Sequence, residues 1–253
     1  GTGDVLLEFC NLLENRANRD GAGILVRKRL GNHQINMCSI HHNYAGDQGA
    51  GVCYFKTEKA SVFDTELMEN IAMNGGGIFT ASPQPLSIKD SRFEANQAQQ
   101  DGGGLYALNT QVVADRTSFT SNAAGNDGGG LKLDQSEGYF SNMDFYANMG
   151  VYLGGGCYVT NSSELHLGTS SFNENQASEG GAILNEINSQ ATIKDCKIRS
   201  NQAWGSAFAG GGLTTDGSST SNVGTTLICA NSAVNTNGAY VDLGGNTIST
   251  SCP

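Results

Sequence analysis

One short motif recurs through the whole chain at a nearly constant interval, and a repeat of this length limits the choice of folds more than composition does. Each copy is a group of three small residues, mostly glycines, followed by an aliphatic residue or a cysteine. The residues that follow the small group are Ile24, Val52, Ile78, Leu105, Leu131, Cys157, Ile183, Leu213 and, in a weaker copy, Val241. They are separated by 28, 26, 27, 26, 26, 26, 30 and 28 residues, which indicates nine units.

A second motif supports the same register. It is an apolar residue followed three positions later by asparagine, and it precedes each copy of the first motif. The asparagines are Asn15, Asn43, Asn70, Asn96, Asn122, Asn148, Asn175, Asn201 and Asn231. Segments such as 86–88 and 191–193 alternate apolar and polar residues, which is typical of strands and not of helices. Each unit is therefore expected to be a coil of short strands that pairs only with its neighbours at a spacing of about 4.8 Å.

The motif residues have mechanical roles in such a coil. Phe93, Phe119, Phe145 and Phe172 occupy equivalent positions and are expected to point inward as an aromatic stack. The motif asparagines are expected at turns, where asparagine tolerates a left-handed backbone and its amide can pair with the next asparagine in a ladder. The glycine triplets allow a tight corner and a close approach of backbone segments.

One unit carries both motifs in the form found in a known family. Gly180-Gly181-Ala182-Ile183 follows Phe172-Asn173-Glu174-Asn175, whereas most other units have a third glycine in place of alanine. These motifs resemble the passenger repeats of the chlamydial polymorphic outer-membrane proteins and, more widely, the right-handed β-helix repeats of the pectin-lyase-like superfamily. The resemblance covers roughly residues 9–243 and implies surface display and adhesion. The expected fold is an all-β, right-handed parallel β-helix of about nine coils, a single domain over residues 1–253 with a C-terminal cap at about 244–253.

Charge and hydropathy exclude some classes of partner. The chain has 24 acidic and 14 basic residues, a net charge of -10, and nucleic-acid binding needs a basic footprint. No apolar run approaches the roughly 18–20 residues of a membrane span. We therefore expect no nucleic-acid partner and no membrane insertion by this segment. The resemblance to the surface-protein repeats implies an extracellular or cell-surface location. Whether the segment belongs to a longer surface protein stays open.

The repeat register also sorts the seven cysteines. Cys10 and Cys38 lie five residues before the motif asparagine in consecutive units, so their expected separation falls in the range for a disulfide. Cys229 and Cys252 lie in the last coil and the tail, where a bridge would hold the cap. Cys157 replaces an aliphatic core residue and is expected to be inert. No cysteine spacing typical of zinc is present, so no metal site is expected.

One predicted outer face is rich in charge. Asp64, Asp90 and Arg116 lie six residues before the motif asparagine in consecutive units, and Glu66 and Arg92 lie four before it. Enzymes with this kind of fold that act on acidic polysaccharides use carboxylates, a Ca²⁺ ion or an arginine base on such a face. The simpler interpretation, which we prefer, is a solvated ladder of opposite charges. No catalytic residue and no cofactor are therefore assigned, and Ca²⁺ enters only with the enzyme alternative.

A second outward column follows the aliphatic anchors. Phe79, Tyr106, Tyr158 and Leu184 are its apolar members, and contiguous exposed apolar groups mark contact surfaces, so we predict that they bind a partner. Stacking between neighbouring strands would also explain them. Asn161, in the sequence Asn161-Ser162-Ser163, is the predicted glycosylation site if the source is eukaryotic and secretory.

These patterns favour an extracellular structural, adhesive or assembly module with a protein or glycan partner at the cell surface, or with further copies of itself. An enzyme is the less favoured interpretation. Two alternatives stay open: a lyase or hydrolase acting on an acidic polysaccharide through the charged face, and a carbohydrate-binding solenoid without catalysis. The observation that separates them is whether the charged face is a cleft or a flat wall.

Overall fold

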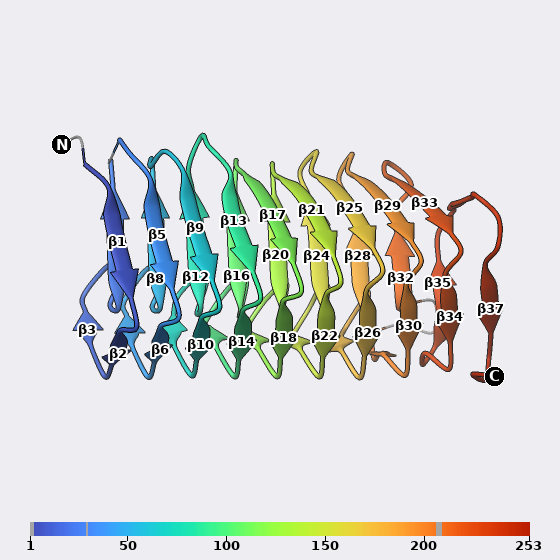
Figure 1. Cartoon of the computed structure of the whole chain (residues 1–253). Helices are drawn as coiled ribbons and strands as arrows, with labels where there is room; N and C mark the ends of the chain where they lie inside the picture. Colours follow the sequence, from blue (N-terminus) through green and yellow to red (C-terminus); the bar gives the residue numbers. More distant parts are fainter. Residues whose placement is uncertain (1–2, 29, 206–208) are drawn as a thin grey trace.

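The chain forms a rod of stacked β-coils, with its two ends at opposite ends of the rod (Figure 1). The structure is a computed structural model that describes residues 3–28, 30–205 and 209–253. Within these ranges the chain contains strands and turns and no helix, so none is available to span a membrane. The strands form four sheets that run the length of the rod, and neighbours in each sheet come from successive coils.

The first and second sheets each have ten strands. The first contains β1 (Val5–Glu8), β5 (His33–Asn36), β9 (Ala60–Phe63), β13 (Leu86–Lys89), β17 (Gln111–Asp115), β21 (Glu137–Ser141), β25 (Glu164–Gly168), β29 (Gln190–Lys194), β33 (Thr220–Gly224) and β36 (Val241–Asp242). The second contains β2 (Asn11–Leu13), β6 (Ser39–His41), β10 (Glu66–Met68), β14 (Arg92–Glu94), β18 (Ser118–Thr120), β22 (Asp144–Tyr146), β26 (Ser171–Asn173), β30 (Lys197–Arg199), β34 (Leu227–Cys229) and β37 (Thr247–Ser249).

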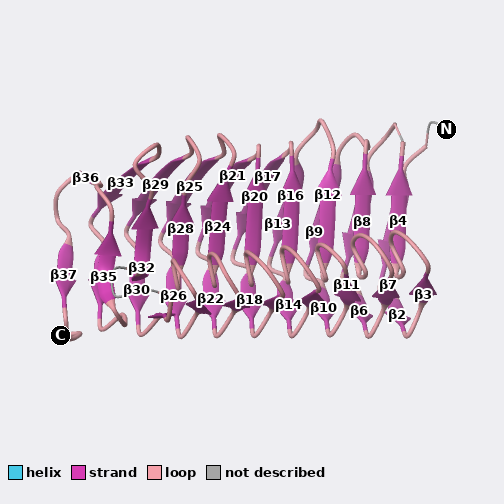
Figure 2. Cartoon of the chain, turned by 180° about the vertical axis from the view of Figure 1, so that it is seen from behind, coloured by secondary structure: helices cyan, strands magenta, loops and turns pink. Residues whose placement is uncertain are grey.

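The third sheet has eight two-residue strands and the fourth has nine strands. The third contains β3 (Arg16–Ala17), β7 (Tyr44–Ala45), β11 (Ile71–Ala72), β15 (Gln97–Ala98), β19 (Ala123–Ala124), β23 (Met149–Gly150), β27 (Gln176–Ala177) and β31 (Gln202–Ala203). The fourth sheet, whose strands follow one another across Figure 2, contains β4 (Ile24–Arg27), β8 (Val52–Phe55), β12 (Ile78–Ala81), β16 (Leu105–Leu108), β20 (Leu131–Asp134), β24 (Cys157–Thr160), β28 (Ile183–Asn185), β32 (Gly210–Thr215) and β35 (Val234–Asn237). Strand pairing is parallel and in register with the repeat, as in Phe93 beside Phe119.

Left-handed residues turn the chain at the corners of each coil. In one coil they are Asp90 (φ 51°), Ala95 (φ 51°), Gly102 (φ 65°) and Asn109 (φ 47°). We expected the motif asparagine to take this conformation, and that was wrong: the residue before it does. The reversal of the backbone at Ala95 aims the Asn96 side chain into the core, where Asn96 is fully buried.

The predicted aromatic stack is confirmed. The rings of Phe93, Phe119, Phe145 and Phe172 lie at successive centroid distances of 4.5, 5.1 and 4.4 Å, within 12° of parallel. In the coils that carry a phenylalanine, the third glycine of the triplet makes room for the ring, because a Cβ on Gly104 would lie 2.7 Å from Phe119 Cδ1. In this part of the core each buried ring therefore packs against the backbone of a glycine.

The asparagine ladder is also confirmed. Each amide nitrogen donates to the side-chain oxygen of the next asparagine, as Asn96 does to Asn122 at 3.0 Å and Asn122 to Asn148 at 3.0 Å. The same nitrogen donates to a backbone carbonyl of the preceding coil, for Asn122 that of Phe93. Each oxygen also accepts a backbone N–H, which for Asn122 comes from Asn96. The ladder therefore satisfies buried polar groups that would otherwise cost stability.

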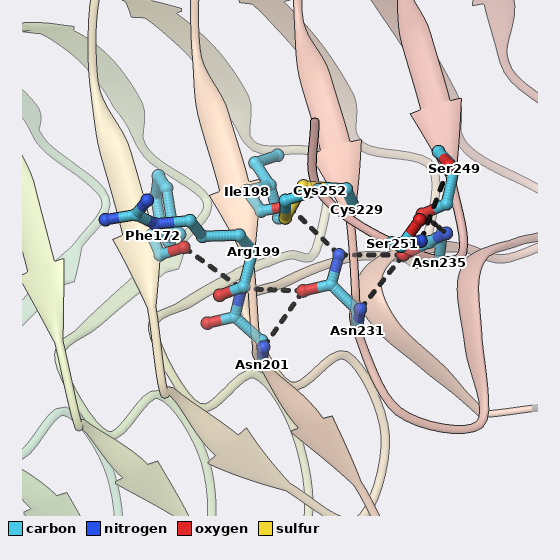
Figure 3. The surroundings of a disulfide bond; sticks show 10 residues. All are labelled: Phe172, Ile198, Arg199, Asn201, Cys229, Asn231, Asn235, Ser249, Ser251 and Cys252. Carbon is cyan, nitrogen blue, oxygen red and sulfur yellow. Dashed lines mark hydrogen bonds between the residues drawn. A yellow bond between two sulfur atoms is a disulfide. The ribbon is translucent and has the colours of Figure 1, made fainter.

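The C-terminal end is closed by the predicted disulfide between Cys229 and Cys252 (Figure 3). The expected cap segment contains a further strand, β37, which pairs with β34. The ladder ends there as well, because Asn231 donates to Asn235 and Asn235 donates to the carbonyl of Ser249.

The predicted Cys10–Cys38 disulfide is wrong, because both cysteines are free thiols. Cys38 Sγ accepts the backbone N–H of Cys10 at 3.4 Å and donates to the carbonyl of Asn36 at 3.2 Å. In the next coil Thr65 Oγ1 makes the same two bonds, to the N–H of Cys38 and the carbonyl of Phe63. The column is a hydrogen-bonding ladder in which side chains point the same way, so the sulfurs keep the strand spacing.

Candidate functional site

The predicted charged face lies along the corner between the first and second sheets. Asp64, Asp90 and Arg116 have left-handed backbone conformations at equivalent corners. Arg116 binds Asp90 with two hydrogen bonds of 2.7 and 3.0 Å, and its third nitrogen pairs with Asp115. Hydrogen bonding to Arg116 lowers the pKa of Asp90. A general acid needs a pKa raised toward neutrality, so this shift runs against such a role.

The other two predicted residues of this face are neighbours without being partners. Glu66 and Arg92 pair in register between β10 and β14, but Arg92 makes its ion pair with Glu94 at 2.5 Å. A shallow depression of about 480 Å³ lies beside Asp90 and Arg116. The face is therefore an open wall on which Asp90, Arg116 and Arg92 are paired, whereas no ion pair is formed by Asp64 or Glu66 among the described residues.

The predicted binding column is buried, so the expectation of an exposed contact surface was wrong. The exposed fractions of Phe79, Tyr106, Tyr158 and Leu184 are 1%, 9%, 4% and 1%. The turn before each strand folds back over the column, and a Cβ on its first glycine would lie 2.7 Å from Tyr106 Cβ at Gly102. Alternation placed these residues on the outer side of the strand but could not show that the turn covers them.

A polar cluster closes the middle of this column. Lys132 Nζ lies 2.9 Å from Asp101 and 3.5 Å from Asp127, between the rings of Tyr106 and Tyr158 at 5.5 and 5.0 Å. Burial raises the pKa of Asp127 and of both tyrosines. The two carboxylates balance the charge of Lys132, and the cluster is explained by the packing of successive coils against one another.

The surface beside this column is an apolar hollow of about 440 Å³. Its lining is Phe55, Lys56, Ala81, Ser82, Pro83, Leu108 and Asn109. Phe55, Ala81 and Leu108 are the second outward residues of their strands and are only partly buried. Sequence reasoning missed them because it followed the first outward residue after each anchor, whereas alternation also places the third residue after the anchor on that face.

Basic side chains border the hollow. Arg27 and Lys56 lie 5.1 and 5.4 Å from the centre of the Phe55 ring. Lys28 lies at the equivalent corner one coil away, since its backbone N–H donates to the carbonyl of Phe55. Arg27 forms an ion pair with Asp20 at 3.7 Å, whereas neither Lys28 nor Lys56 forms one among the residues that the structure describes. This corner is therefore positive on a chain of net charge -10.

The predicted glycosylation site lies on the expected turn after β24. Asn161 has φ 57°, and its amide nitrogen donates to Asp134 at 2.8 Å. Ser163 is buried and donates to the carbonyl of Leu133. Modification of Asn161 would have to break its bond to Asp134, and the site stays a prediction.

Two family models match the chain. The model described as the right handed beta helix region matches residues 1–125. The chain is a right-handed β-helix repeat protein. The model of the Chlamydia polymorphic membrane protein repeat matches residues 169–186, which include Phe172 to Asn175 and Gly180 to Ile183. The second match points to an outer-membrane or surface context. No curated protein and no solved structure matches the chain.

Proposed function

We propose that the chain is an adhesive display module of an extracellular or cell-surface protein, which holds a protein or glycan partner against the outer face of the fourth sheet. The observation that carries this proposal is the hollow beside Phe55, Ala81 and Leu108, because exposed apolar surface with a polar rim is typical of interaction sites. Lys56, which lines the hollow, and Lys28 at the equivalent corner one coil away favour a partner with negative groups near an apolar one. The internal ladders support the proposal, since they hold this surface on a rigid support.

The enzyme alternative has weaker support. Its residues, Asp90 and Arg116 above all, hydrogen-bond to each other on an open wall.

A second depression continues the hollow along the rod. It is lined by Pro85, Gln111 and Glu137 among others, has a volume of about 370 Å³ and would extend the proposed binding surface. A non-catalytic carbohydrate-binding role is one form of the proposed function, because a glycan is one of its two partner classes.

The test compares binding by three variants on a glycan array and on a panel of extracellular matrix proteins. Phe55→Ser and Leu108→Ser should each weaken binding by about tenfold or more, since apolar anchors of interfaces contribute about 2 kcal/mol or more. The control variant, Tyr146→Ser, changes an exposed residue on the second sheet and should bind as the parent does. Equal binding by all variants would contradict the proposed surface. Cleavage of an acidic polysaccharide that is lost on substitution of Asp90 would favour the enzyme.

A further inference from the structure

Two adjacent histidines meet at the end of β6. His41 is the last residue of the strand, and His42 forms the left-handed corner that follows, with φ 55°. Their rings are nearly perpendicular, at 78°, and the two Nδ1 atoms are 2.9 Å apart. The His42 side chain is 51% exposed, so a small solute can reach the pair.

Fixed partners hold the far nitrogen of each ring. His41 Nε2 lies 2.9 Å from Asn11 Oδ1, and His42 Nε2 lies 2.8 Å from Glu69 Oε2. Both partner atoms are acceptors, so each Nε2 carries a hydrogen. The two Nδ1 atoms then face each other at a hydrogen-bond distance, where either a shared proton or a metal ion can hold them.

The surroundings favour a cation. Glu14 and Glu69 occupy the corners equivalent to His42 in the coils on either side, with φ 55° and 51°. Of the arginines in this region, Arg16 lies over the ring of Tyr44, 5.0 Å from its centroid, and Arg92 pairs with Glu94. Histidine ligands of metals characteristically donate their second N–H to a carboxylate or a carbonyl, which is the arrangement that Asn11 and Glu69 provide here.

The geometry points to a divalent transition-metal ion of tetragonal preference, Cu²⁺ or Ni²⁺, bound by the Nδ1 atoms of His41 and His42. With metal–nitrogen bonds of about 2.0 Å, a separation of 2.9 Å corresponds to a bond angle of about 90° at the metal. That angle suits neighbouring ligands in a square-planar or tetragonal site, whereas a tetrahedral Zn²⁺ site would need about 3.3 Å. Within the described residues no group of three or more His, Cys, Asp or Glu side chains could hold a metal, so water completes the coordination.

The test is a titration of the purified chain with Cu²⁺, followed by calorimetry and by electron paramagnetic resonance. The parent should bind one Cu²⁺ per chain with hyperfine structure from two nitrogens. His41→Ala and His42→Ala should each lose at least tenfold in affinity and one coupled nitrogen. His166→Ala is the matched control, since His166 is also partly exposed and bonded to a glutamate, Glu164, and it should bind as the parent does.

Two further variants test the positioning groups. Glu69→Ala should weaken Cu²⁺ binding by about 10- to 100-fold with both nitrogens still coupled, as is usual when the partner of a metal-bound histidine is removed. Asn11→Asp keeps an acceptor beside His41 and should retain the metal. Absence of Cu²⁺ binding, or equal binding by the parent and His42→Ala, would overturn the proposal. A histidine pair that NMR shows to share a proton that Cu²⁺ does not displace would overturn it as well.

Discussion

Replacing one rung of the asparagine ladder with alanine should cost the fold far more than a surface substitution would. Asn122→Ala removes four hydrogen bonds: two accepted from the backbone and side chain of Asn96, and two donated to Phe93 and Asn148. The N–H of Asn96 then has no acceptor in a fully buried position, which costs about 1–3 kcal/mol. Each of the other three bonds is worth about 0.5–1.5 kcal/mol, because the Asn96 amide keeps its bond to the carbonyl of Leu67 and the Asn148 oxygen keeps the N–H of residue 122. We expect a total loss of about 2.5–7.5 kcal/mol.

The assay is equilibrium urea unfolding followed by circular dichroism. Solenoids do not always unfold in one step, so the two-state test must be passed before free energies are compared. The matched control is Asn15→Ala at the exposed start of the ladder, where the amide donates to Asn43 at 2.9 Å. Its removal leaves no buried donor unpaired and should cost less than about 1 kcal/mol. Equal losses for both variants, or a loss below about 1 kcal/mol for Asn122→Ala, would refute the role of the ladder.

Three other perturbations test the packing. Gly104→Ala should lower stability by about 1–3 kcal/mol in urea unfolding, because its Cβ would lie 2.6 Å from the carbonyl oxygen of Gly130 and 2.7 Å from Phe119 Cδ1; no loss would mean that both the backbone of the next coil and the ring can move. His33→Leu should raise the unfolding midpoint, since both ring nitrogens of His33 are buried without a partner; a lower midpoint would contradict this. Burial raises the pKa of Cys53 from 9.0 to about 12, so the stability tied to its protonated thiol is full below pH 9 and is lost as the pH rises toward 12. Unfolding at pH 8–11 should show this loss in the parent and less of it in Cys53→Ala, and identical profiles would refute it.

The core could be predicted from sequence because in-register stacking follows from the repeat itself. Once Phe93 and Phe119 occupy the same position in successive units, the strand spacing brings their rings together. The same reasoning placed Asn96 beside Asn122, and the two do form a rung of the ladder. Both contacts follow because successive coils repeat the same structure along the rod, so they can be predicted without knowing the paths of the loops.

The surface could not be predicted in the same way. Alternation places Tyr106 on the outer side of its strand, but only the path of the turn at Gly102 shows that it is covered. The repeat register correctly places Cys10 and Cys38 in neighbouring coils. Each Sγ, however, donates a hydrogen bond to the carbonyl two residues earlier, and this direction keeps the two sulfurs apart. The hollow beside Phe55 depends in the same way on where the loop at Pro83 lies.

The most direct test of the account is hydrogen exchange at the asparagine side chains, because the ladder joins every coil to the next. In a two-dimensional NMR spectrum recorded after transfer to D₂O, the side-chain amide hydrogens of the fully buried asparagines, such as Asn96, Asn122 and Asn148, should persist as long as those of the core backbone. Exposed asparagines such as Asn142 should lose their signals at once. If the amide signals of the ladder disappear together with those of the exposed asparagines, the coils are not held together in the way described.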